Sequence, residues 1–211
     1  MKNIDLNVFV DNSCGVNPGQ TMEHAQAVLE YLNTKAAPDP RDLEEVLDIL
    51  AINANLADEH GIARDAYNKA VIVKKELYGT ESSQVAAALK DYGDMLMRIG
   101  NFAQAESVLD AALAVWHKQV SRMNCMLGDT LDAVSVCIRE RGDFVEARKY
   151  AEQAVEALER SGIEQSSLVP ALQNLGIILR ALGEEDEADR VEARVKELKE
   201  AFKEAHPRPK D

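Results

Sequence analysis

Four glycines, spaced almost evenly along the chain, constrain its fold most strongly. They are separated by 39, 42 and 41 residues, and each is followed five residues later by an alanine. The glycines are Gly61, Gly100, Gly142 and Gly183, and the alanines are Ala66, Ala105, Ala147 and Ala188. Self-similarity at a fixed period of this length is the signature of a repeat architecture. The sequence therefore predicts four similar structural units in series.

The residues before each glycine predict a helix. Seven residues before it stands a small residue, and eleven residues before it stands a leucine: Leu50, Leu89, Leu131 and Leu172. Counted from that leucine, positions i, i+3, i+4 and i+7 are mostly apolar or small, which is the stripe of an amphipathic helix. We predict that each unit is a hairpin of two helices. The glycine ends the first helix because it tolerates left-handed dihedral angles, and the small residues let the two helices approach closely.

The rest of the chain is assigned around these hairpins. Residues 38–204 are predicted to hold the four repeats, residues 21–37 a single capping helix, and residues 1–20 an irregular N-terminal arm. Residues 205–211 are predicted to be a disordered tail. The third link, "SRMNCMLGDTL", is the least turn-like, and a continuous or distorted helix from Phe102 onward is left open there.

Charge and composition exclude several classes of partner. The chain has 37 acidic and 24 basic residues, a formal net charge of −13, and no basic stripe, so we expect no nucleic acid and no membrane as partner. The N-terminus lacks the apolar run of a signal peptide. Cys14, Cys125 and Cys137 have no ligand spacing, and reduced thiols in a cytoplasmic protein are the simplest interpretation.

Residues suited to catalysis are scattered. The four histidines are dispersed, no Cys or His has a partner at the spacing of a metal site, and neither a glycine-rich phosphate loop nor a serine elbow is present. The sequence therefore predicts a protein that is not an enzyme, with no catalytic residues, no cofactor and no bound metal.

A helix pair with a leucine, a small residue four positions later, a terminal glycine and an alanine five positions further resembles the tetratricopeptide repeat. Units of 39–42 residues are most similar to the kinesin light chain class of this repeat. The resemblance implies an all-α, right-handed α-solenoid of about four helix-hairpin repeats with capping helices, acting as a protein–protein interaction scaffold. Asn53 and Glu192 depart from the pattern, because each occupies a position where an apolar residue is usual.

The resemblance also implies a binding groove. In this family, the face of each first helix opposite the apolar stripe lines a concave groove. The candidate peptide-binding residues on this face are Asn55, Lys90, Asp91, Asp94, Met97, Asp132, Val136, Arg139, Gln173, Asn174, Ile177 and Arg180. Asn174 falls where related repeats hold a peptide backbone. Because aspartates dominate the middle of this face, the expected ligand is a protein or peptide segment with Lys or Arg beside apolar residues.

Two alternatives stay open at this point. The groove residues are ordinary exposed residues without a ligand, or the chain is a structural, self-associating subunit of a homo-oligomeric scaffold. The apolar part of "NIDLNVFV" is a candidate contact for self-association, and the same arm is also a candidate occupant of the protein's own groove.

Overall fold

The computed structural model describes residues 17–119, 124–161 and 165–205, and within these ranges it contains α-helices and no strand. The all-α prediction is confirmed. Most of the predicted N-terminal arm and nearly all of the predicted tail lie outside the described residues. The chain divides into two compact units, residues 1–99 and residues 100–211. Each unit is described by itself.

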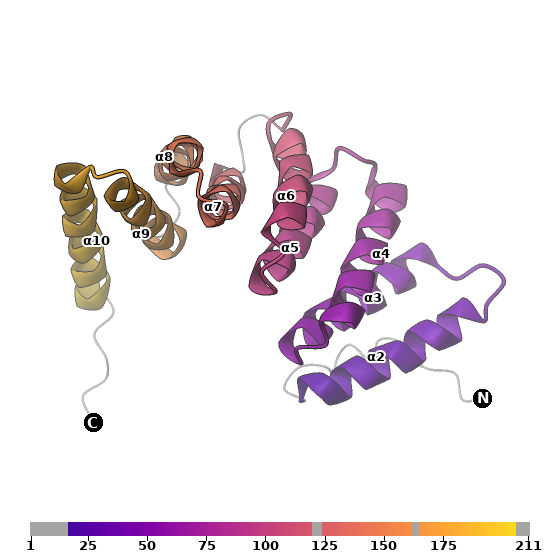
Figure 1. Cartoon of the computed structure of the whole chain (residues 1–211). Helices are drawn as coiled ribbons and strands as arrows, with labels where there is room; N and C mark the ends of the chain where they lie inside the picture. Colours follow the sequence, from indigo (N-terminus) through magenta and orange to yellow (C-terminus); the bar gives the residue numbers. More distant parts are fainter. Residues whose placement is uncertain (1–16, 120–123, 162–164, 206–211) are drawn as a thin grey trace, which may run out of the picture. The chain divides into compact units, whose positions relative to one another are not determined.

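The first unit is a series of helices, each packed on the next. They are α2 (Pro18–Asn33), α3 (Pro40–Leu56), α4 (His60–Tyr78) and α5 (Ser83–Arg98). Among the described residues, helix α2 has no hairpin partner of its own, and it lies against α3 (Figure 1). It begins three residues earlier than the predicted start at residue 21, because Asn17 accepts a hydrogen bond from the Gly19 amide and Pro18 suits a first helical position.

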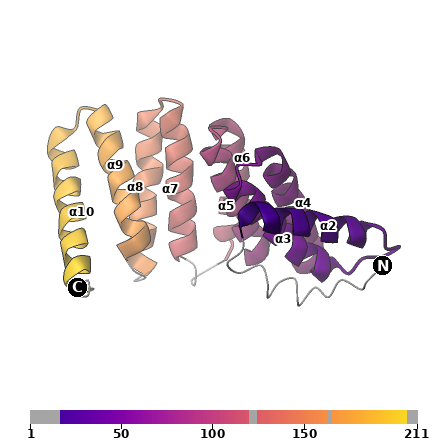
Figure 2. The ribbon, with the colours of Figure 1, turned by 90° about the horizontal axis from the view of Figure 1, so that it is seen from below.

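The second unit continues the same pattern. Its helices are α6 (Phe102–Trp116), α7 (Asn124–Glu140), α8 (Phe144–Ser161), α9 (Gln165–Ala181) and α10 (Glu185–Ala205). Figure 2 shows α7 to α10 side by side, with consecutive helices in contact. Helices α6 and α7 are separate elements, so a continuous helix through the third link is excluded. The fold is thus an all-α solenoid of helix hairpins, and α2 is the first helix described.

Three of the four predicted turn glycines adopt left-handed dihedral angles. The φ angles are +75° at Gly100, +87° at Gly142 and +79° at Gly183. The prediction for Gly61 is wrong, since this residue lies in the first turn of α4. In the first hairpin Asp58 takes the left-handed position, with a φ of +60°. Aspartate is one of the few other residues that adopt this conformation, because its short polar side chain can hydrogen-bond locally.

The small residues of the pattern meet inside the α7–α8 hairpin. Ser135 and Ala147 are both fully buried, and the Ser135 hydroxyl donates a hydrogen bond of 2.9 Å to the Ala147 carbonyl. Ala151 and Ala154 continue the buried stripe of α8. The alanines therefore set how closely the helices pack, in addition to favouring helix formation.

The turn geometry predicts opposite effects for two glycine-to-alanine substitutions. Gly142→Ala places a side chain at positive φ, and we expect it to lower the free energy of unfolding by about 1 kcal/mol. Gly61→Ala is the matched control, because an added Cβ meets nothing within 4 Å and the residue lies in a helix. It should leave stability unchanged or raise it slightly. Urea unfolding followed by circular dichroism measures both, and equal effects would contradict the assignment of the turn.

Candidate functional site

A pocket of about 280 Å³ lies in the first unit, where α3, α4 and α5 meet. Helices α3 and α5 are the first helices of consecutive repeats. The side of the unit that these first helices form is called the first-helix face, and the pocket lies on it. Helix α4 forms its base, because Tyr67, Ala70 and Lys74 are buried. The lining residues are Asp48, Ile52, Tyr67, Ala70, Lys74, Gln84, Ala87, Ala88 and Asp91.

The charge at the base of the pocket is paired. The Lys74 ammonium group contacts Glu44 Oε1 at 2.8 Å and Asp48 Oδ2 at 2.7 Å, and the Tyr78 hydroxyl donates to Glu44 at 2.7 Å. Burial would lower the pKa of Lys74, but hydrogen bonds to Asp48 and Glu44 outweigh it and raise the pKa above its usual 10.5. Burial raises the pKa of Asp48 by more than Lys74 lowers it. One cation thus balances two carboxylates, which leaves the cluster negative.

Asp91 faces Asp48 across the pocket from α5 and has no such cation. Among the described residues no side chain forms an ion pair with Asp91, since Lys90 pairs with Asp94 at 2.5 Å. Loss of hydration raises the pKa of Asp91 above its usual 3.8, and the negative charge of Asp94 raises it further. Burial is the main cause that raises the pKa of Tyr67 to about 12, and the negative charges of Asp91, Asp94 and Asp48 add to the increase. The pocket therefore has a negative potential.

An apolar side chain lies beside this carboxylate pair. Ile52 lines the pocket and is 51% exposed, so it presents a large apolar side chain to solvent there. Tyr67 stacks on Tyr92 with 6.1 Å between the ring centroids and so has a fixed orientation. The pocket combines unbalanced negative charge with apolar surface.

Of the candidate residues predicted in the first unit, only Asp91 lines this pocket. Lys90 and Asp94 neutralise one another one helical turn apart. Asn55 and Met97 are half-buried and outside the lining. The Asn55 carbonyl accepts a hydrogen bond from Arg98, which also pairs with Asp58 and so joins the ends of α5 and α3.

In the second unit, Asn174 connects two first helices. Its amide donates to Asp132 Oδ1 on α7 at 2.8 Å and to Ser135 Oγ at 3.2 Å, while its carbonyl oxygen accepts from Arg139 at 2.5 Å. Asn174 is 5% exposed, so its side chain is committed to this network. The polar groups of Asn174 are therefore occupied and buried in this structure, and its contact with a peptide backbone stays a prediction.

The other candidates of the second unit differ in their surroundings. Arg180 pairs with Glu185, Asp189 and Glu192 at 2.7–2.8 Å, and so fixes α10 on α9. This contact explains why Glu192 stands where an apolar residue is usual. Gln173 is exposed, Ile177 is 55% exposed and Val136 is half-buried. These three positions stay predictions for ligand contact.

The exposure of one repeat position differs between the two units. Nine residues before the glycine of the repeat pattern, the first unit has Ile52 and Asp91, both exposed, whereas the second unit has Ala133 and Asn174, both buried. Direct contact between α7 and α9 closes the first-helix face there. Sequence reasoning missed Asp48, Tyr67 and Lys74, although a lysine on the buried stripe of α4 was a signal for a nearby carboxylate.

The described residues contain no group of three or more His, Cys, Asp or Glu placed to hold a metal ion. No helix among them is long and apolar enough to cross a membrane.

The tetratricopeptide repeat family model matches residues 123–201, which cover α7, α8, α9 and most of α10. A search of curated proteins finds no match. Among solved structures, BtubC (BKLC) from P. vanneervenii is 19% identical, with a TM-score of 0.75 over 92% of this chain and 78% of its own. A putative kinesin light chain from Podosopora anserina with TPR-like repeats is 15% identical, with a TM-score of 0.76 over 94% of each chain.

A Rap protein complexed with competence and sporulation factor is also similar in fold. It is 18% identical, with a TM-score of 0.66, and the match covers 86% of this chain and 49% of the Rap chain. Residues 123–201 therefore match the tetratricopeptide repeat family, and the fold is that of kinesin light chain-like repeats over nearly the whole length of the chain.

Proposed function

We propose that this protein–protein interaction module is non-catalytic and binds a peptide segment through the first-helix face of the first unit. The preferred segment carries Lys or Arg beside an apolar residue. The family supports the general role, and the Rap structure shows that a related fold is found with a bound factor. The unpaired carboxylate of Asp91, beside the exposed Ile52 in the α3–α5 pocket, is the observation that carries the proposal.

The physical basis is the cost of leaving Asp91 unpaired. Its raised pKa reports that the charged form is poorly stabilised in the free protein. An ammonium or guanidinium group placed between Asp91 and Asp48 would supply the missing partner. An adjacent apolar side chain of the ligand would cover Ile52 and gain from the removal of that surface from water. Such a two-part contact selects basic and apolar residues at neighbouring positions.

Binding should depend on salt and pH in defined directions. Added salt screens the charged contact and should weaken binding. A bound cation favours the ionised form of Asp91, so its pKa is lower in the complex than in the free protein. Affinity should therefore be highest above the raised pKa of free Asp91 and should fall as the pH is lowered through it.

The test uses fluorescence polarisation with two labelled peptide pools, one combining Lys and Leu in a Ser-Gly background and one with Glu in place of Lys. The full chain should bind the Lys pool in preference. Asp91→Lys should weaken that binding by about tenfold, because reversing a charge at a partly dehydrated contact costs more than removing an exposed pair. Ile52→Ser should also weaken it.

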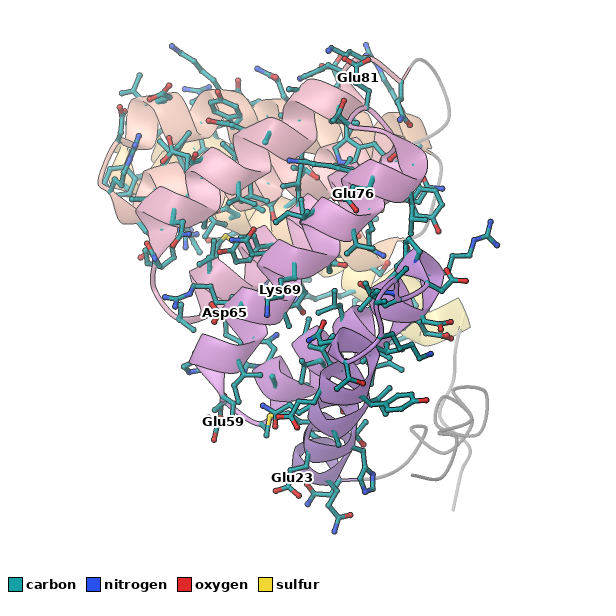
Figure 3. All side chains as sticks on the ribbon, turned by 90° about the vertical axis from the view of Figure 1, so that its right-hand side faces the viewer. Glu23, Glu59, Asp65, Lys69, Glu76 and Glu81 are labelled. Atoms are coloured by element: carbon teal, nitrogen blue, oxygen red, sulfur yellow. The ribbon has the colours of Figure 1, made fainter. Side chains whose placement is uncertain are left out.

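Glu76→Lys is the matched control, because it makes the same change in net charge elsewhere on the first unit. Figure 3 shows Glu76 with Asp65 and Lys69 along the outward surface of α4, and it is absent from the pocket lining. The control should bind like the unaltered chain. Equal binding of both pools, or equal loss in Asp91→Lys and Glu76→Lys, would show that the pocket is not the binding site.

A further inference from the structure

A second pocket, of about 380 Å³, lies between the start of α9 and the last turns of α10. Its lining residues are Ser166, Val169, Pro170, Leu198, Lys199, Phe202 and Lys203. The surface of this α9–α10 pocket is mostly apolar, and Phe202 is 52% exposed there. Exposed apolar surface beside a hollow is typical of a contact site for another protein.

The lengths of the two helices explain why apolar surface is accessible at this end of the second unit. Helices α9 and α10 run in opposite directions from the turn at Gly183, so the end of α10 lies beside the start of α9. Helix α10 has 21 residues and α9 has 17. At a rise of ~1.5 Å per residue, the last turn of α10 therefore extends past the described start of α9 by about 6 Å. No helix follows α10 in the described part of the chain.

The charges of these last turns lie on different sides of α10. Both charged lining residues are lysines, Lys199 and Lys203, in a chain whose net charge is −13. Lys203 contacts Glu200 at 2.9 Å, but this pair is exposed, with 69% and 56% of the two side chains accessible, and an exposed pair holds its partners weakly. Among the described residues Lys199 forms no ion pair. Because Glu197, Glu200 and Glu204 are exposed and none of them lines the pocket, the pocket itself is basic.

Apolar and basic side chains form two neighbouring rows on α10. Leu198 and Phe202 are four residues apart, as are Lys199 and Lys203, and residues four apart lie on one side of a helix with about 6 Å between them along its axis. A ligand that meets both rows needs apolar and acidic groups in neighbouring rows of the same spacing. An extended segment does not supply them, because its successive side chains point to opposite sides. A helix does, because residues i and i+4 form one row and residues i+1 and i+5 form the next.

We propose that the α9–α10 pocket binds an amphipathic helix of a partner protein, with apolar residues four positions apart and carboxylates in the neighbouring row. The apolar row contacts Leu198 and Phe202, and the carboxylates pair with Lys199 and Lys203. Insertion of the apolar face of a helix into a groove is a common mode of recognition. Because the whole chain is acidic and repels acidic ligands, the two lysines determine where such a helix binds. The site differs from the α3–α5 pocket in its unit and in the charge of its ligand.

The test uses fluorescence polarisation of the full chain with two labelled, Ala-rich helical peptides of the same composition. Both carry a row of leucines four positions apart. The first has its glutamates in the row next to the leucines, and the second has them on the opposite side of the helix. The first peptide should bind about tenfold more tightly, because only its glutamates reach the lysines while its leucines occupy the pocket. Lys199→Glu combined with Lys203→Glu should weaken its binding by about tenfold, and Phe202→Ser should weaken it too.

Lys75→Glu combined with Lys149→Glu is the matched control, because it makes the same change in net charge at exposed lysines outside the pocket. This control should bind the first peptide like the unaltered chain. Ile52→Ser, which alters the α3–α5 pocket, should also leave that binding unchanged, so failure of one site can be told from failure of the other. Circular dichroism melts check that every variant folds.

Three results would overturn the proposal. The first is that neither peptide binds, or that both bind equally. The second is an equal loss of binding in the two double lysine variants. The third is a mass that rises with concentration in light scattering of the unaltered chain and no longer rises when Lys199 and Lys203 are replaced, which would assign the pocket to a second copy of this chain.

Discussion

Gly128→Leu is expected to lower the free energy of unfolding by about 3 kcal/mol or more, because the site has no room for a side chain. Even an alanine Cβ built on Gly128 would lie 2.6 Å from Leu158 Cγ and 3.1 Å from the Ala154 carbonyl oxygen. Leu158 is 4% exposed and cannot move into solvent without opening the α7–α8 hairpin. Chemical unfolding should therefore show a loss that grows from Gly128→Ala to Gly128→Leu.

Gly176→Ala is the control for the same chemical change at another glycine inside a helix. Its nearest neighbour would be Val191 Cγ1 at 3.8 Å, an ordinary contact distance. Because alanine favours a helix more than glycine by about 1 kcal/mol, this substitution should be neutral or stabilising. Equal effects of Gly128→Ala and Gly176→Ala would show that helix propensity, and not the close approach of α7 and α8, decides the outcome.

Gly128 also shows where repeat patterns stop being informative. Fourteen residues before the glycine of the repeat pattern, the other repeats carry Leu47, Ala86 and Val169, so the repeat pattern does not predict a glycine at this position. The pattern predicted the helices and most turns because those depend on local features: apolar periodicity, glycine and proline. The distance between two particular helices depends on side chains from both, and a single sequence does not reveal their contact.

For the candidate site too, the sequence predicted the repeat positions of the residues but not their contacts. Periodicity placed Asp91 and Asn174 at the same repeat position, but their surroundings differ. Asp132 and Arg139 bind Asn174, whereas no equivalent pair among the described residues binds Asp91. The departure at Glu192 likewise has a contact as its cause, the ion pair with Arg180. Such pairs join residues 12 to 42 positions apart, which is beyond the reach of helical periodicity.

The ion cluster at the base of the α3–α5 pocket gives the second large expected effect. Lys74→Met should lower the free energy of unfolding at pH 7 by about 2 kcal/mol, since it leaves Glu44 and Asp48 without their partner. This is less than the ~3–5 kcal/mol lost when a fully buried pair is broken, because 42% of the Asp48 side chain is exposed to solvent screening. Lys75→Met, on the exposed side of the same helix, is the matched control and should have little effect.

The pH dependence of stability shows whether the loss in Lys74→Met comes from the unpaired carboxylates. In the unaltered protein, hydrogen bonds from Lys74 and Tyr78 outweigh burial and lower the pKa of Glu44, so the stability due to Glu44 is present above pH 4.5 and is lost as the pH falls through that lowered pKa. Without Lys74, burial raises the pKa of both carboxylates, and protonation relieves their repulsion. The difference in stability between Lys74→Met and the unaltered protein should therefore shrink as the pH is lowered. A difference independent of pH would mean that lost packing is responsible.

The same substitution connects stability to binding. Lys74 is the only cation among the residues that line the α3–α5 pocket, so its removal makes the potential there more negative. Lys74→Met should therefore bind the Lys-containing peptide pool more tightly than the unaltered chain while being less stable. If both stability and affinity fall, Lys74 supports the binding surface, and the negative potential of the pocket is not what attracts the Lys-containing peptides. Lower stability together with higher affinity would show that Lys74 has two separate effects. It stabilises the fold by pairing with Glu44 and Asp48, and it weakens peptide binding because its charge reduces the negative potential of the pocket.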